Sequence, residues 1–105
     1  MTKSYDIILT TTGSKEETDR LAEMLISRQL AACVQVINIG STYMWQGKIT
    51  QEAEFLLLIK TASHLYSEVE KIIVENHSYE IPEIIQIPIV QGLPAYLAWI
   101  DENTK

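Results

Sequence analysis

A long hairpin predicted at the centre of the chain constrains the fold more than any other feature. Strand-like residues run from position 33 to 45, and a return strand is expected over residues 48–60. The two residues between them, Gln46 and Gly47, are typical of a tight turn, because glycine adopts a positive φ at little cost. Both strands are about twice as long as the usual five to six residues.

This hairpin is predicted to extend beyond its own domain. The segment 34–45 spans about 40 Å when fully extended at ~3.3 Å per residue. A compact chain of this length has a diameter of only roughly 34 Å. An overhanging apolar tip usually finds a partner, and this tip carries Tyr43, Met44, Trp45 and Ile49. The alternative is a strongly coiled hairpin that folds back on its own body.

The remaining segments alternate between strand and helix patterns. We expect a strand at 5–12, a helix to about 29, the hairpin, a helix at 64–76, a strand at 84–90 and a short helix from 94. The order β-α-β-β-α-β-α is that of an α+β, ferredoxin-like split βαβ sandwich, with two helices on one face of an antiparallel sheet. The 105 residues, 1–105, are expected to form a single domain.

Local signals refine these elements. Ser14 and Glu17 fit a capping box at the start of the first helix, and Ser63 is expected to cap the second. A slip in the apolar alternation between Val36 and Ile37 predicts a bulge.

The C-terminal part of the chain carries two informative prolines. Pro88 has no amide donor, so its strand is expected at a sheet edge. Pro94 suits the first turn of the last helix. The residues of that helix expected to pack inward are Tyr96, Leu97, Trp99 and Ile100.

Charge and apolar content exclude several classes of partner. The formal net charge is −6 and the eight basic residues are scattered, so neither a nucleic acid nor an anionic membrane surface is an expected partner. The longest apolar run is five residues, whereas a membrane span needs about twenty. No signal peptide is visible and Cys33 is the only cysteine, which favours the cytoplasm.

Few residues carry candidate chemistry. Cys33 is read either as a small buried hydrophobe or as a soft metal ligand or redox thiol. His77 is either a hydrogen-bonding loop residue or a metal ligand or proton donor, whereas His64 is expected at the surface. Glu52 and Glu54 are expected on the same face of their strand, where they form either a solvated acidic surface or a cation site. No set of nucleophile, base and orienting residue is recognisable.

Several motifs occur in an order that points to a known family. They are Leu-Ala-Ala-Cys-Val at 30–34, Tyr-Met-Trp-Gln-Gly-Lys-Ile at 43–49 and His-Ser-Tyr-Glu-Ile-Pro-Glu-Ile at 77–84, with single matches at Glu54, Lys60, Pro88, Tyr96 and Trp99. From about residue 7 to residue 100 the chain resembles the CutA divalent-cation tolerance family.

The resemblance implies a cytoplasmic homotrimer of ferredoxin-like protomers, similar to the PII signalling proteins, whose long hairpin reaches across a neighbour. It implies a role in tolerance of copper and other divalent cations, with metal or a small ligand bound weakly, and no enzymatic activity. Animal relatives are linked to anchoring of a membrane enzyme. A trimeric scaffold or interaction module is therefore the alternative, and an enzyme that uses His77 with Glu83 or Tyr79 is a third hypothesis.

The resemblance also implies site residues. Cys33 and His77 match positions of candidate metal ligands, although Thr10 and Asn76 stand where some members have a cysteine and a histidine. With Glu83 close to His77 in sequence, modest binding of Cu(II) or Zn(II) is expected, and no cofactor is required. Expected near the clefts between protomers are Trp45, Lys48, Glu54, Lys60, Tyr79, Tyr96 and Trp99.

Overall fold

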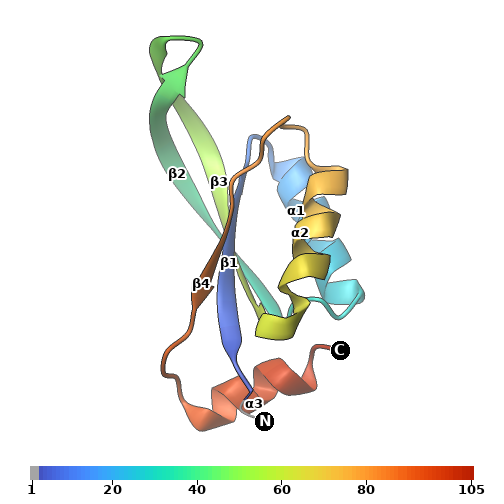
Figure 1. The fold of residues 1–105 in the computed structure, drawn as a ribbon. Helices are drawn as coiled ribbons and strands as arrows, with labels where there is room; N and C mark the ends of the chain where they lie inside the picture. The colour runs from blue at the N-terminus through green and yellow to red at the C-terminus, as the bar shows by residue number, and fades with distance from the viewer. Residues whose placement is uncertain (1–2) are drawn as a thin grey trace.

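Strands and helices alternate along the chain in the predicted order (Figure 1). The structure is a computed structural model, and it describes residues 3–105. Its elements are β1 (Tyr5–Thr12), α1 (Lys15–Ser27), β2 (Cys33–Trp45), β3 (Lys48–Ala62), the 3₁₀ turn η1 (Ser63–Leu65), α2 (Tyr66–Asn76), β4 (Ile84–Pro88) and α3 (Pro94–Glu102).

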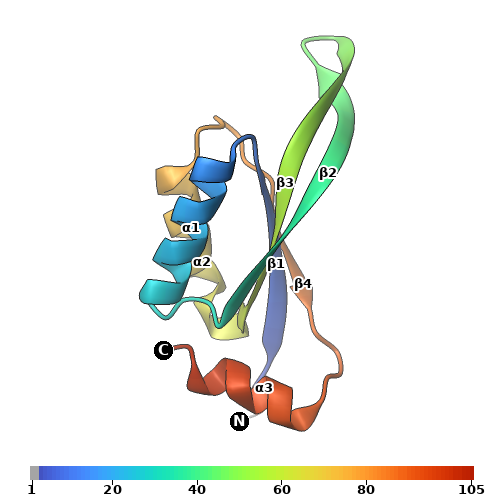
Figure 2. The ribbon, with the colours of Figure 1, turned by 180° about the vertical axis from the view of Figure 1, so that it is seen from behind.

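The strands form one antiparallel sheet in the order β2-β3-β1-β4. Figures 1 and 2 show α1 and α2 side by side on one face of this sheet and α3 across its lower end. The predicted ferredoxin-like α+β class is therefore confirmed, and β4 lies at the edge, as expected from Pro88. No helix within residues 3–105 is long and apolar enough to cross a membrane.

Side chains that alternate along the strands give the sheet two different faces. One face carries Ile8, Leu57 and Ile59, which are fully buried beneath the helices together with Leu21 of α1 and Ile73 of α2. Each such side chain contributes about 1.5–3 kcal/mol by leaving water. This layer is the core that holds the helices on the sheet.

We call the opposite side of the sheet the open face, because α1 and α2 leave it uncovered (Figure 2). Its apolar side chains come from all four strands and follow from the strand registers. Of these, Ile37, Ile85 and Ile87 are 50%, 47% and 41% exposed, and half-buried beside them lie Ile7, Leu9, Leu56 and Leu58. A protomer alone therefore exposes an extended apolar surface.

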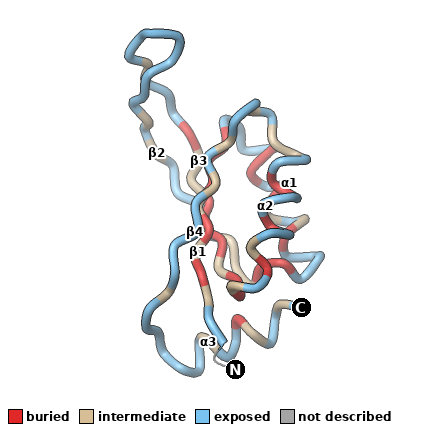
Figure 3. The backbone as a smooth tube through the Cα atoms, in the orientation of Figure 1, coloured by how far each residue is buried: buried red, intermediate tan, exposed pale blue. Residues whose placement is uncertain are grey.

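The hairpin overhangs the domain, as predicted. Thr12, the last residue of β1, pairs with Phe55, so residues 39–54 have no sheet neighbour except each other. We call this segment the arm; it extends away from the helices in Figure 1 and is largely exposed in Figure 3. The molecule measures 47 × 25 × 21 Å along its principal axes. The alternative of a hairpin folded back on its body is therefore wrong.

The hairpin of β2 and β3 contains no bulge, contrary to the prediction at Val36 and Ile37. The register is continuous from the pair of Cys33 and Lys60 to the pair of Trp45 and Lys48. Both residues stay exposed because they lie near the outer edge of the sheet, so no buried pattern forces a slip. Gln46 (φ 49°) and Gly47 (φ 77°) form the predicted turn.

The predicted start of α1 is confirmed, whereas the second bond of its capping box and two other predicted boundaries differ from the structure. Ser14 caps α1 by accepting a hydrogen bond from the Glu17 amide at 3.2 Å, but the Glu17 carboxylate binds Ser78 rather than completing a capping box. The Ser63 side chain does not cap α2, because the 3₁₀ turn η1 precedes that helix. β4 ends at Pro88 rather than at residue 90, although the next amide, that of Ile89, still donates to the Tyr5 carbonyl.

Only part of the last helix packs as predicted. Ile100 is fully buried, whereas Tyr96 and Trp99 are exposed. The Tyr96 ring faces the Lys60 ammonium of β3 rather than the core, and it stays 37% exposed.

Candidate functional site

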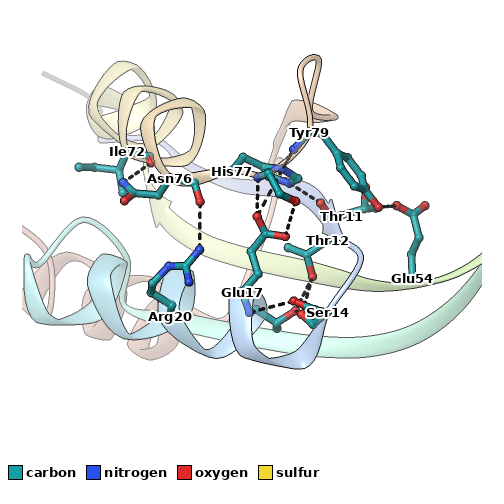
Figure 4. A network of polar contacts seen from close by, with 12 residues as sticks. Thr11, Thr12, Ser14, Glu17, Arg20, Glu54, Ile72, Asn76, His77 and Tyr79 are labelled. Carbon is teal, nitrogen blue, oxygen red and sulfur yellow. Dashed lines mark hydrogen bonds and ion pairs between the residues drawn. The ribbon is translucent and has the colours of Figure 1, made fainter.

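The loop that follows α2 is held in a network of hydrogen bonds (Figure 4). At its start, the His77 side chain is fully buried. The carbonyl of Thr11 only accepts, so the His77 Nε2 atom 2.6 Å away donates to it. The Nδ1 atom accepts from the Tyr79 amide at 3.0 Å. His77 is therefore a neutral ring with both nitrogens in use, which matches its interpretation as a hydrogen-bonding loop residue.

A buried carboxylate supports the same loop. Glu17, in the first turn of α1, accepts from the Ser78 amide at 2.6 Å and from the Ser78 hydroxyl at 3.0 Å. Its Oε2 atom lies 3.7 Å from Nδ1 of His77. Hydrogen bonds of this kind offset the cost of removing a charge from water. They attach the loop to α1 (Figure 4).

Tyr79 extends this network to the base of the arm. Its hydroxyl donates to Oε2 of Glu54 at 2.8 Å, and Glu54 is buried. Burial, followed by the hydrogen bond to Glu54, raises the pKa of the Tyr79 phenol well above its usual value, so the hydroxyl keeps its proton and acts as a donor. Gly13 makes room for it, since a Cβ atom there would lie 3.1 Å from the Tyr79 oxygen.

Three of the predicted cleft residues form a second cluster at the far end of the open face. The Lys60 ammonium lies 5.6 Å from the centroid of the Tyr96 ring. The Tyr96 ring is stacked on Trp99, with centroids 5.6 Å apart. A cation near an aromatic stack that is open to solvent is able to hold a planar or anionic group.

The other predicted cleft residues are not joined to this cluster within one protomer. Trp45 and Lys48 pair across the turn at the tip of the arm, whereas α3 lies at the opposite end of the molecule (Figure 1). Glu54 and Tyr79 lie between the two ends and contact each other. The seven predicted cleft residues therefore fall into three separate groups.

The predicted metal ligands are not assembled in the protomer. No group of three or more His, Cys, Asp and Glu side chains suited to a metal occurs within residues 3–105. Cys33 is half-buried, rather than fully buried, opposite Lys60 on the open face. His77 lies at the other end of the sheet beside Thr11, and Glu83 is exposed.

Sequence reasoning missed the residues that hold the loop. Glu17 was assigned to a helix cap, and neither Gly13 nor Thr11 was singled out. The hydrogen-bond partner of Glu17 is Ser78, 61 residues away, and that of Thr11 is His77, 66 residues away. The one available signal was Glu17 itself, an acidic residue in the first turn of α1.

Comparisons with known proteins agree on one family. The family model described as CutA1 divalent ion tolerance protein matches residues 6–103. The divalent-cation tolerance protein CutA of Archaeoglobus fulgidus is 41% identical over 101 residues, covering 96% of this chain and 99% of its own. That of Thermus thermophilus is 37% identical over 100 residues, covering 94% and 97%.

Solved structures show the same likeness. The structure of the periplasmic divalent cation tolerance protein CutA from Archaeoglobus fulgidus superposes with a TM-score of 0.94 at 40% identity, covering 96% of this chain and 99% of that one. CutA1 from Oryza sativa gives a TM-score of 0.94 at 39% identity, covering 97% and 94%. Family model, relatives and structures all span nearly the whole chain, and the protein therefore belongs to the CutA1 family of divalent-ion tolerance proteins.

Proposed function

We propose that the protein acts in divalent-cation tolerance, copper included, as a homotrimer that binds a cation or a small ligand weakly at the clefts between protomers. The observation that carries this proposal is the open face. Ile37, Ile85 and Ile87 leave between 41% and 50% of their surface exposed, on the two edge strands of an apolar sheet face. Exposed apolar patches of this extent usually mark an interface.

The shape of the arm supports a closed ring of protomers. An arm that extends past its own body can be covered by a neighbour, and if the arm of each protomer lies on the next one, the contact is head-to-tail. A head-to-tail contact that closes on itself gives a ring. Such a ring would bring the Trp45 and Lys48 of one protomer towards the open face of the next and create clefts that a single chain lacks.

Cation binding is expected to be weak. To bind a metal, His77 must give up its hydrogen bond to Thr11 or to the Tyr79 amide. Imidazole and carboxylate ligands suit Cu(II) or Zn(II), and a proton competes with the metal for the ring. Dissociation constants in the micromolar range or weaker are expected, with affinity falling as the pH falls.

Calorimetry with Cu(II) and Zn(II) tests this site in the assembled protein. Binding is expected to disappear in His77→Ala and to survive in Cys33→Ser. Binding unchanged by His77→Ala would remove the site. Loss in Cys33→Ser alone would transfer it to the thiol of Cys33, which is half-buried on the open face.

An interaction module without ligand chemistry is the second candidate function. It is favoured by the lack of a three-ligand cluster within residues 3–105. A thermal-shift screen over metals and metabolites separates the two, because a ligand at a hundred times its dissociation constant stabilises a fold by about 2.7 kcal/mol. No shift with any cation, together with an intact trimer, would favour the module.

We also propose a cytoplasmic location. Its support is Cys33, a lone free thiol of the kind that persists in a reducing compartment. The Archaeoglobus fulgidus protein is described as periplasmic, and a relative from Oryza sativa is described as chloroplastic. Cell fractionation of the source organism tests this location. Recovery of the protein outside the soluble cytoplasmic fraction would be the contrary result.

A further inference from the structure

Lys60 places a positive charge on an apolar part of the open face. It is half-buried on β3, an inner strand of the sheet, and its partners in register are Cys33 on β2 and Ile7 on β1. Ile87 of β4 continues the same row across the sheet. Within residues 3–105, no carboxylate forms an ion pair with Lys60. A partly buried lysine normally has an anion as its partner.

Two aromatic rings of α3 border this charge. The Lys60 ammonium lies 5.6 Å from the centroid of the Tyr96 ring, close to the limit of about 6 Å for a cation–π contact. Trp99 is stacked on Tyr96, with the two ring planes 22° apart. Both rings remain exposed. The contact with Tyr96 therefore compensates the ammonium only in part, and aromatic surface beside it stays free.

The combination of charge and rings selects a class of ligand. An ammonium pairs with a carboxylate, and a stack of two rings favours a further flat ring. The neighbours Ile7 and Ile87 are apolar and supply no side-chain donor, so an anion with several charges would lose its water without replacement. The net charge of −6 also repels such anions from the protein as a whole.

We propose that Lys60, Tyr96 and Trp99 bind a planar aromatic carboxylate with a single charge. The carboxylate pairs with the Lys60 ammonium, and the ring packs against the exposed part of the aromatic stack. This inference rests on the proposed function, because it names the class of small ligand for the proposed clefts. It assigns no metal to the cluster, because the ammonium repels cations.

Nuclear magnetic resonance tests the ligand class on the wild-type protein. Benzoate is the probe, and the indole N–H signal of Trp99 reports its binding. We expect a dissociation constant on the order of 1 mM, as is usual for so small a ligand. Benzyl alcohol keeps the ring without the charge, and cyclohexanecarboxylate keeps the charge without the flat ring. Each should bind at least about fivefold more weakly than benzoate.

Substitutions of Lys60 test the residue that receives the carboxylate. Lys60→Met keeps the length of the side chain and should weaken benzoate binding about tenfold, whereas Lys60→Arg keeps the charge and should stay within about threefold of wild type. The matched control is Lys71→Met, which removes an exposed lysine from α2 and should leave the affinity unchanged. All variants are compared at the same mass by light scattering. The three probes on wild type decide the matter if Lys60→Met fails to fold.

The outcomes separate this inference from the proposed function. No shift with benzoate, equal affinity for the three probes, or wild-type affinity in Lys60→Met would overturn the inference, and an assembled protein that still binds Cu(II) or Zn(II) would then leave the proposed function standing. Selective benzoate binding that depends on Lys60 supports the inference. If the same protein is a monomer or binds no cation, only the proposed function fails.

Discussion

At the scale of single residues, Thr10 is the one buried side chain of residues 3–105 whose polar atom lacks a hydrogen-bond partner. It is fully buried on the helix-facing side of β1, where its neighbours in register are Leu57 and Ile84. An unpaired buried hydroxyl costs free energy that an apolar group of the same shape does not. Thr10 is therefore a place where the protein is less stable than its packing allows.

Replacing Thr10 with valine is expected to raise the free energy of unfolding by about 1 kcal/mol. The control is Thr61→Val, because the equally buried Thr61 hydroxyl donates to the Leu30 carbonyl at 2.6 Å. The free energy of unfolding of Thr61→Val should be about 1–2 kcal/mol lower than that of wild type. Urea unfolding measures both, and a loss in Thr10→Val as large as that in Thr61→Val would contradict the assignment.

A second prediction concerns the positive φ of Gln29. This residue follows α1 with φ 58°, a left-handed conformation that glycine adopts without steric cost. Gln29→Gly should therefore stabilise the protein by about 0.5–1 kcal/mol, whereas Gln35→Gly in the exposed part of β2 should destabilise it by a similar amount. Thermal unfolding of both variants provides the comparison; a change of the same sign in both would count against the prediction.

At the scale of elements, the order and type of the strands and helices were predictable because each has a strong hydrophobic period. The arm was predictable from strand length alone. The 3₁₀ turn before α2 was not predictable, because serine is a common capping residue but the Ser63 side chain makes no capping bond. The bulge was predicted from a slip at Val36 and Ile37, a rule that holds only where one strand face is buried.

The two helix starts give a prediction at this scale. Ser14→Ala removes the hydroxyl that accepts from the Glu17 amide and should lower the free energy of unfolding by about 1 kcal/mol. Ser63→Ala removes no capping bond and should change it by less than about 0.5 kcal/mol. Chemical unfolding of the pair checks this; equal losses would mean that Ser63 also caps a helix.

The candidate site was less predictable than the elements. Lys60, Tyr96 and Trp99 were singled out from the family resemblance, and they do lie together. The pairing of Tyr79 with Glu54 has no local sequence signal, because the two residues are 25 positions apart and meet only when the loop after α2 folds over Gly13. Tertiary contacts of this kind become visible only in the folded chain.

At the scale of the whole molecule, the open face and the arm are two parts of one surface. The open face is apolar and the arm has an apolar tip; both lie outside the cover of α1 and α2, and both leave a protomer with exposed side chains such as Ile85 and Ile49. A ring of three protomers would cover them together. We therefore propose the open face as the contact between protomers.

Light scattering on an open-face variant tests this contact. Wild type is expected at three times the 11.9 kDa chain mass. Ile85→Glu places a charge on the open face and should give a monomer, whereas Val74→Glu, at a similarly exposed position on α2, should leave the mass unchanged. A wild-type monomer, or an Ile85→Glu variant that keeps the wild-type mass, would mean that the open face is not the contact between protomers.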